Sequence, residues 1–422
     1  MPTEPYALRK MKRNNLPFFI IVVLLFAAEY SYACSSAVIS GKITPDGRPL
    51  LWKHRDTDFP QNSVKYFDGE RYSFIGVVNS VADDPQEIWV GTNSAGFSIM
   101  NTQSYNLVEI KDGEERGAAN GRIMCLALEV CATVQDFRNF LDTIQKPSLI
   151  EANLGVIDAN GGASMFEVDY YNYVEYDANN PKDAPFGYIA RTNFSFAGKI
   201  NDGGGYVRYM EVEKRLMAAA TTKEITPAWI FKELSRSFSH PLLGIDLRSG
   251  DFNRPHTNGW FIDQDFIPRK STASSVVVQG VKENENPDLT VMWTILGYPP
   301  VGVAMPVWVK GAKKQLPVLL ARDNSTKVSP LCDKVVTLAN RVFSYNQGMG
   351  SSRYFNWELL HNPSGTGYMQ KLAPIEEEVF RFVKPRFEEW RQAGKLDEKQ
   401  LHQLYQDLDL YVSDSYYEIF EL

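Results

Sequence analysis

The sequence predicts a layered α+β domain that carries a helical C-terminal extension. Strand-like apolar runs come first, helical periodicity follows in the middle of the chain, and strand-like runs return before residue 310. After Pro330 charged residues become frequent and apolar residues recur at helical spacing. A doubly wound nucleotide-binding sheet is disfavoured, because the glycine-rich residues 202–205 lack the spacing of a phosphate-binding loop.

Short runs rich in β-branched and aromatic residues, bounded by turn residues, predict the strands. They are expected at 35–40, 50–53, 72–79, 87–90, 97–101, 188–192, 273–279, 289–296 and 301–309, with a hairpin or pair of strands over 153–176. Helical spacing predicts helices at 121–130, 133–144, 206–219, 227–238, 333–345, 373–394 and 397–417. Thr133 is suited to cap a helix and Pro227 to open one. Residues 249–269 are expected to form loops.

The first 33 residues differ from the rest of the chain. A basic head precedes an apolar run over 17–28, which is too short to span a bilayer comfortably. Ser31 and Ala33 then place small residues at positions −3 and −1 before Cys34. This order predicts a secretory signal peptide cleaved after Ala33, and therefore a periplasmic or secreted protein. The alternatives are an uncleaved anchor helix and a lipoprotein signal that lipidates Cys34; Ser31 disfavours the lipoprotein signal, which usually has an apolar residue there.

Composition narrows the class of protein. The chain has 422 residues and a formal net charge of −7, and basic residues are concentrated only at the extreme N-terminus. A nucleic-acid partner is not expected, because phosphate binding needs a concentrated basic face. The five histidines are scattered and the cysteines have no metal-ligand spacing, so no metal site is predicted. Four cysteines are too few for a disulfide scaffold, although two of Cys125, Cys131 and Cys332 could pair in an exported protein.

An N-terminal cysteine would combine two reactive groups on one residue. Cleavage after Ala33 would give Cys34 both a thiol and a free α-amine. An α-amine has an unperturbed pKa of about 7.7–8.0, so part of it is unprotonated near neutral pH. It could accept the thiol proton and later protonate a leaving nitrogen, so that Cys34 serves as nucleophile and base. On position alone, a small buried thiol behind a signal peptide is an equally good interpretation.

Several motifs strengthen the catalytic interpretation through their order. Cys34 opens the run CSSAV, and the runs that follow are LWKHRDTD at 51–58, GTNSAGFSIMN at 91–101, ARTN at 190–193 and GYVRY at 205–209. In this order they resemble the N-terminal-nucleophile amide hydrolases, which include choloylglycine hydrolases and penicillin V acylases. The acyl-CoA:6-aminopenicillanate acyltransferase-like, linear amide C–N hydrolase group is the most similar branch. The resemblance extends to Trp308 and does not explain the helical tail.

The resemblance implies the four-layer αββα sandwich of this superfamily, and it implies a role for five residues besides Cys34. Arg55 would favour the thiolate, Asp58 would hold the α-amine, Asn101 would donate to the oxyanion, Asn193 would contact the amine or the oxyanion, and Arg208 would be a second active-site arginine. Taken alone, Arg55 and Asp58 also fit a solvated turn with a weak surface ion pair. Arg191 and Arg215 lie near enough in sequence to be confused with Arg208.

The predicted organisation is a signal peptide (1–33), a hydrolase domain (34–330) and a helical extension (331–422). The predicted reaction is attack of Cys34 on a linear amide, giving an acyl-thioester that water resolves. The expected partner is a small acyl-amide substrate, with no cofactor and no stable membrane insertion after signal cleavage; the oligomeric state is left open. The rival interpretations are an acyltransferase of the same fold, a lipid-anchored binding protein with acylated Cys34, and an inactive hydrolase fold used only for binding.

Overall fold

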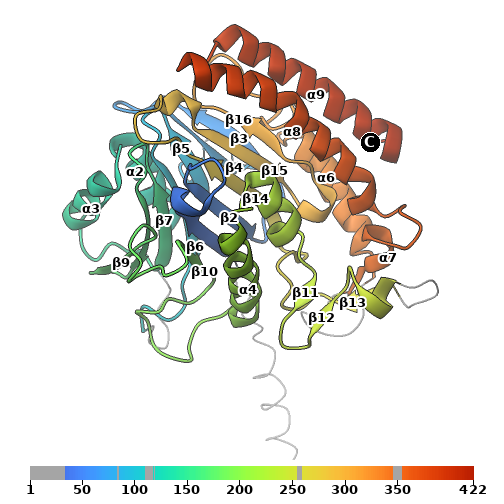
Figure 1. The fold of residues 1–422 in the computed structure, drawn as a ribbon, viewed down its shortest axis with the longest axis horizontal. Coiled ribbons are helices and arrows are strands. Elements are labelled where there is room, and N and C mark those ends of the chain that lie inside the picture. Colours follow the sequence, from blue (N-terminus) through green and yellow to red (C-terminus); the bar gives the residue numbers. More distant parts are fainter. Residues whose placement is uncertain (1–33, 83–84, 110–116, 118, 254–258, 346–353) are drawn as a thin grey trace, which may run out of the picture.

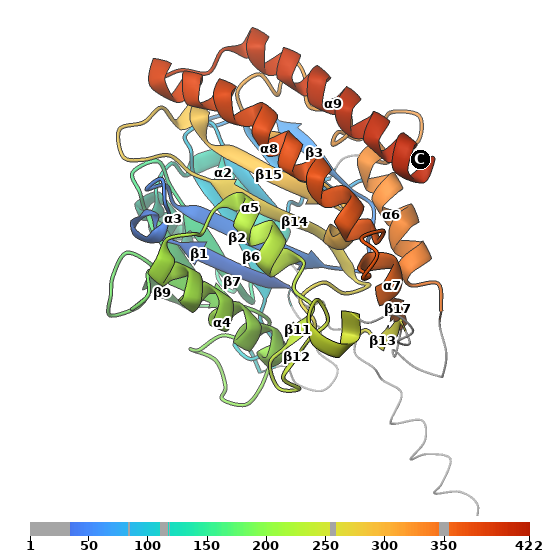
Figure 2. The ribbon, with the colours of Figure 1, turned by 45° about the vertical axis from the view of Figure 1, so that its right-hand side comes forward.

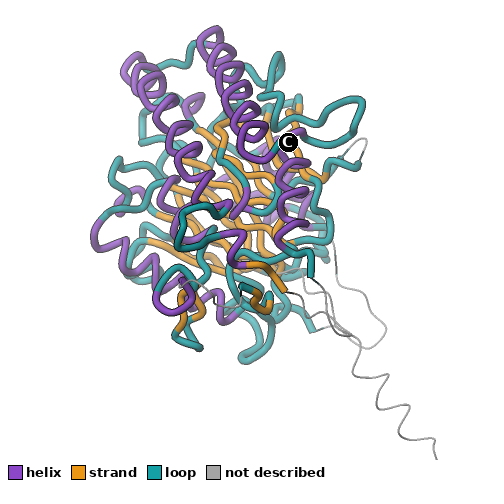
Figure 3. The backbone as a smooth tube through the Cα atoms, turned by 90° about the vertical axis from the view of Figure 1, so that its right-hand side faces the viewer, coloured by secondary structure: helices purple, strands orange, loops and turns teal. Residues whose placement is uncertain are grey.

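The computed structural model describes residues 34–422 except 83–84, 110–116, 118, 254–258 and 346–353 (Figure 1). Within the described residues, two antiparallel sheets lie face to face, and helices cover both outer faces. Figure 3 shows the strands inside and the helices outside. The predicted α+β sandwich with four layers is therefore confirmed. The predicted signal peptide, residues 1–33, lies outside the described residues.

The six-stranded sheet contains the start of the described chain, in the strand next to one edge. Its order is β10 (Tyr188–Arg191), β1 (Ser35–Ile39), β2 (Leu50–Asp56), β14 (Thr272–Gln279), β15 (Val291–Leu296) and β16 (Met305–Val307). All neighbours are antiparallel, and Ser35 lies opposite His54. Cys34 therefore lies beside the end of β2, where Lys53, Arg55 and Asp56 carry charge.

The seven-stranded sheet is a simple meander, because strands adjacent in sequence are adjacent in space. It contains β3 (Asn62–Phe67), β4 (Phe74–Asn79), β5 (Val90–Asn93), β6 (Ser98–Gln103), β7 (Ala152–Ile157), β8 (Ala163–Val168) and β9 (Tyr173–Asp177). The predicted hairpin over 153–176 is a set of three strands. The strand expected at 87–90 begins only at Val90, and β3 was not predicted. A side chain at Gly155 would collide with Val38 and Leu51 of the other sheet, which shows how closely the sheets pack.

One outer layer covers the seven-stranded sheet. It consists of α2 (Asn120–Val130) and α3 (Val134–Thr143), at the left of Figure 1. Apolar side chains of both helices, Leu128 and Phe137 among them, share a core with Ile99 and Phe166 of the sheet. Thr133 caps α3 in a capping box with Asp136, as its position in the sequence predicted.

The other outer layer covers the six-stranded sheet. It is made of α4 (Tyr206–Thr222), α5 (Pro227–Trp229), the π-helical turn η2 (Ile230–Ser235), α6 (Pro330–Val342), α7 (Trp357–Leu360), α8 (Tyr368–Ala393) and α9 (Glu398–Phe420). Figure 2 shows α8 and α9 side by side across β14 and β15. Trp308 next to β16 packs edge-on against Phe387 and Trp390, with ring centroids 5.4 and 5.7 Å away. The C-terminal helices thus share one core with the sheet.

Short elements complete the fold. They are the strand pairs β11 (Ser239–His240) with β12 (Ile245–Asp246) and β13 (Trp260–Ile262) with β17 (Tyr354–Asn356), and the 3-10 turns η1 (Gly41–Ile43), η3 (Gly250–Asn253), η4 (Pro287–Leu289) and η5 (Pro299–Val301). The expected loop over 249–269 therefore contains a strand, because residues beyond 353 pair with it. None of the helices in the described part of the chain combines the length and apolar character needed to cross a membrane.

Candidate active site

Cys34 lies at the start of β1 with its side chain only 6% exposed. Its thiol donates to the backbone oxygen of Asp56 at an Sγ–O distance of 3.9 Å. Its own carbonyl oxygen accepts a hydrogen bond from the Arg208 guanidinium at 2.6 Å. The position of Cys34 is thus determined by β2 on one side and by α4 on the other.

Lys53 connects Cys34 to Asn101 across the space between the two sheets. Its ammonium donates to the Asn101 side-chain oxygen at 2.8 Å and also to the Asn101 backbone oxygen. Burial lowers the pKa of Lys53 to about 8, although the adjacent Cys34 raises it. Because Lys53 occupies the Asn101 oxygen, the Asn101 amide nitrogen is the atom that can serve a ligand, and it can only donate.

Arg208 and Asn193 hold the other side of Cys34. Besides the Cys34 carbonyl, the Arg208 guanidinium donates to the Ser35 hydroxyl at 2.9 Å and to the Asn193 side-chain oxygen at 2.8 Å. Burial, followed by repulsion from Arg269, lowers the pKa of Arg208 to about 10, so it remains positive at neutral pH. Gly205 precedes α4 with φ of +80°, and a side chain there would collide with the Arg208 guanidinium.

Asp56 ends β2 with a buried carboxylate, and its backbone oxygen is the one that accepts from the Cys34 thiol. It is 2% exposed and accepts from the Thr272 hydroxyl at 2.6 Å and from Arg269 at 2.6 Å. His54 lies beside Thr272 at 3.2 Å and is fully buried. Burial lowers the pKa of His54 to about 4, so its ring is neutral at physiological pH.

Arg55 lies close enough to Lys53 for its charge to lower the pKa of Lys53, and Asp58 lies beyond the end of the same strand. The Arg55 guanidinium donates to the side-chain oxygens of Asn62 and Asn79 and lies 4.4 Å from the centre of the Trp89 ring. Asp58 is exposed and follows the end of β2. The structure therefore brings together Cys34, Asn101, Asn193 and Arg208 of the predicted set, and Asp58 lies outside this cluster.

Lys53 and Asp56 were not among the predicted site residues, although they have the same spacing as the predicted pair. Residues 53–58 have the sequence KHRDTD. In this run a basic residue is followed by aspartate three positions later in two places, once as Lys53 and Asp56 and once as Arg55 and Asp58. The later pair, Arg55 and Asp58, matched the expected Arg-x-x-Asp pattern. In the earlier pair, the Lys53 side chain interacts with the Cys34 thiol, and the Asp56 backbone oxygen accepts from that thiol.

The remaining cysteines differ from Cys34 in their surroundings. All four cysteines are free thiols, so the pairing considered for Cys125, Cys131 and Cys332 is not formed. Burial raises the pKa of each of these three to about 12. Among the residues that the structure describes, no group of three or more His, Cys, Asp or Glu side chains could hold a metal ion.

A cavity of about 840 Å³ lies away from these residues. It is lined by the second half of α4, including Arg215, and by the β11–β12 pair, including His240. Cys34, Lys53 and Asn101 do not line it. The candidate site is therefore identified from the hydrogen bonds among its side chains and not from a cavity.

The chain is similar to several solved structures at low sequence identity. No protein-family model and no curated protein sequence matches the chain. Among solved structures, conjugated bile acid hydrolase from Clostridium perfringens is 12% identical, with a TM-score of 0.41, 67% of this chain covered and 93% of the other. A Caenorhabditis elegans N-acylethanolamine-hydrolyzing acid amidase ortholog is 15% identical, with a TM-score of 0.38, 60% of this chain covered and 93% of the other. Penicillin V acylase from Agrobacterium tumefaciens is 12% identical, with a TM-score of 0.37, 66% of this chain covered and 86% of the other. The roles of individual residues here rest on the site geometry alone.

Proposed function

We propose that this protein is an exported hydrolase of linear amides that uses Cys34 as an N-terminal nucleophile. The observation that carries the proposal is the buried set of charged and amide side chains around Cys34, formed by Lys53, Asn101, Asn193 and Arg208. Burying charges costs free energy, and such a cost is typical of sites that do chemistry. We assign to Lys53 and Asp56 the roles expected of Arg55 and Asp58.

In the first half-reaction the Cys34 α-amine, freed by cleavage after Ala33, accepts the thiol proton. The sulfur attacks the amide carbonyl, and an S–C bond forms while the carbonyl oxygen becomes negative. The Asn101 amide donates to that oxygen, and Lys53 provides positive charge next to the sulfur. The tetrahedral intermediate then collapses: the C–N bond breaks, the α-ammonium gives its proton to the leaving nitrogen, and an acyl-thioester remains on Cys34.

In the second half-reaction water replaces the amine. The α-amine accepts a proton from water as the water oxygen attacks the thioester carbonyl, and the C–S bond breaks to release the carboxylic acid. The proton returns to the Cys34 sulfur. Attack by an amine in place of water would make the protein an acyltransferase, which leaves the roles of the site residues unchanged.

The surroundings of Cys34 favour a nucleophile over a lipid anchor. A diacylglyceryl group on Cys34 would have to reach a membrane, but the side chain is buried and the Cys34 carbonyl is bound by Arg208. The same contacts favour an active enzyme over an unreactive scaffold, because a purely structural thiol has no need of a buried lysine and a buried arginine beside it.

The experiment that tests the proposal is a substrate panel on protein that begins at Cys34. N-acyl amino acids, conjugated bile salts, penicillin V and N-acylethanolamines would be incubated with the mature protein and with Cys34→Ala, and the released amine measured. We expect turnover of at least one amide by the mature protein and none above background by the variant. Equal release by both proteins would contradict the proposed function.

A further inference from the structure

The loop between β10 and α4, residues 192–205, carries Asn193 to the candidate site. It leaves the edge strand of the six-stranded sheet at Arg191 and crosses to the other sheet. Asn193 is fully buried and holds Arg208, which in turn holds the Cys34 carbonyl. Any displacement of this loop would therefore be transmitted to the nucleophile.

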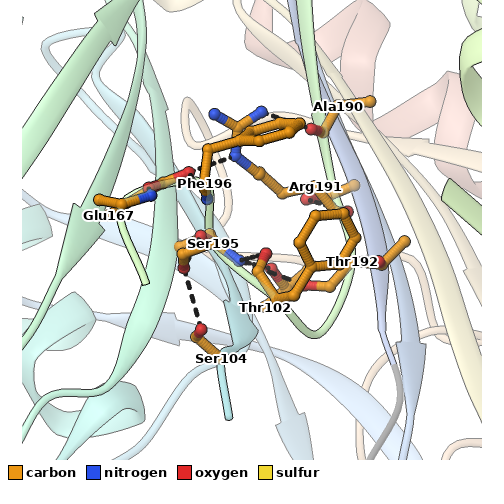
Figure 4. A network of polar contacts seen from close by, with 12 residues as sticks. Thr102, Ser104, Glu167, Ala190, Arg191, Thr192, Ser195 and Phe196 are labelled. Carbon is orange, nitrogen blue, oxygen red and sulfur yellow. Dashed lines mark hydrogen bonds and ion pairs between the residues drawn. The ribbon is translucent and has the colours of Figure 1, made fainter. Parts of the chain in front are cut away.

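A single buried carboxylate ties both ends of the segment around Asn193. Glu167, on β8 of the seven-stranded sheet, accepts from the Arg191 side chain at 2.6 Å, two residues before Asn193. It also accepts from the backbone N–H groups of Phe196 at 2.9 Å and Ala197 at 2.6 Å. Figure 4 shows Glu167 beside Arg191 and Phe196. Glu167 is 1% exposed and Arg191 is 4% exposed, so water does not compete for these bonds.

A second buried side chain fixes the middle of the same segment. The Asn153 amide on β7 donates to the backbone oxygens of Thr192 and Phe194, which flank Asn193 on either side, each at 3.2 Å. The side-chain oxygen of Asn153 accepts from the Ser195 hydroxyl at 2.6 Å. Asn193 thus lies in a short segment that the other sheet holds at both ends and in the middle.

We propose that Glu167 is a positioning residue for catalysis: it holds the loop so that Asn193 keeps Arg208, and through Arg208 the Cys34 backbone, in place. The proposal rests on the proposed function. Displacing a reacting group by about 1 Å can reduce the rate about 100-fold, so an effect on kcat is expected even though Glu167 touches no substrate.

The test compares two buried glutamates with similar partners. Glu376 on α8 accepts from the Arg236 guanidinium at 2.7 and 2.6 Å and from the Ala304 N–H at 2.8 Å, and neither of these partners is a residue of the candidate site. We expect Glu167→Gln and Glu376→Gln to lower Tm by similar amounts. Only Glu167→Gln should lower kcat, by about 10- to 100-fold with KM little changed.

A readout independent of turnover accompanies the kinetics. The rate at which iodoacetamide alkylates Cys34 should change in Glu167→Gln and stay at the wild-type value in Glu376→Gln. If Glu167→Gln does not fold, Glu167→Asp replaces it in the test. The aspartate keeps the negative charge but is too short to reach Arg191 and both N–H groups together. It should lower kcat and change the alkylation rate of Cys34 in the direction expected for Glu167→Gln.

The outcomes separate the two proposals. A wild-type protein whose amide turnover does not depend on Cys34 contradicts the proposed function, and the alkylation rates still test Glu167. Wild-type kcat and an unchanged alkylation rate in a folded Glu167 variant would overturn the positioning role while leaving the proposed function intact.

Discussion

The two ends of strand β2 lie in opposite surroundings although all seven residues are buried. Leu50, Leu51 and Trp52 belong to the hydrophobic core, where burial of apolar surface stabilises the fold. The following four residues, Lys53 to Asp56, are polar or charged and equally inaccessible. Burying them costs free energy that hydrogen bonds only partly offset. The comparison teaches that one strand serves stability at one end and, we infer, chemistry at the other.

The largest effect on activity is expected from removing the thiol. Cys34→Ala should reduce kcat by about 10⁴- to 10⁶-fold, because no other group forms the acyl-thioester. Cys125→Ala is the matched control and should leave kcat unchanged, since that thiol is held in its neutral form by burial. Initial rates of amine release by the two purified proteins check this expectation. A large loss in Cys125→Ala would place the nucleophile elsewhere.

The next effect is expected at the proposed oxyanion donor. Asn101→Ala should lower kcat by about 10²- to 10³-fold, the loss typical of a missing oxyanion donor. The control is Asn93→Ala, because Asn93 accepts from the backbone N–H groups of Ala95 and Phe97 in a turn and is expected to affect stability. Steady-state kinetics with thermal melts distinguish the two. Comparable kcat losses in both variants would argue against Asn101 as the donor.

A change in pH dependence is expected at Lys53. The pKa of Lys53 is lowered to about 8, so its charge is present below that pH and is lost as the pH rises through it. The wild-type kcat/KM should therefore fall on the alkaline side near pH 8. Lys53→Arg should retain activity and move that fall to higher pH, because a guanidinium stays charged. A pH profile with the same alkaline limb in both proteins would show that Lys53 does not set it.

The smallest effect on activity is expected in the aromatic layer. Trp390→Ala removes a buried ring that lies against Trp308 and donates to Gln400, and should lower the free energy of unfolding by about 3–5 kcal/mol. The kcat per folded molecule should not change, because the ring and hydrogen-bond partners of Trp390, which are Trp308 and Gln400, are not residues of the candidate site. Denaturant unfolding and kinetics on the same sample measure both quantities. A fall in kcat larger than the unfolded fraction explains would link the C-terminal helices to catalysis.

The difference between the ends of β2 also explains what the sequence could and could not predict. Cys34 was predicted from the signal-peptide pattern before it, and the family resemblance supplied Asn101, Asn193 and Arg208 through the order of the short motifs that contain them. The choice between Lys53 with Asp56 and Arg55 with Asp58 depended on where β2 ends and which partners its side chains meet. Residue spacing alone carries no such information.

Long-range partners account for the other differences. Local capping chemistry correctly predicted the start of α3 at Thr133. The β13–β17 pair joins segments almost a hundred residues apart in sequence, and so appeared only as loop. Glu167 gave no signal for the same reason, since its partners are Arg191 at the end of β10 and Phe196 in the loop that follows. Contacts of this kind are set by the assembled sheets and not by local pattern.

The most direct test of the central role of Cys34 is intact-mass and peptide mass spectrometry during turnover of an amide substrate. Protein that begins at Cys34 would be compared with protein that retains Ala33 ahead of it. We predict an acyl adduct on the Cys34 peptide, released by hydroxylamine, in the first protein and no adduct in the second, because only the first has a free α-amine. Turnover without an adduct at Cys34, or equal turnover by the extended protein, would contradict the account.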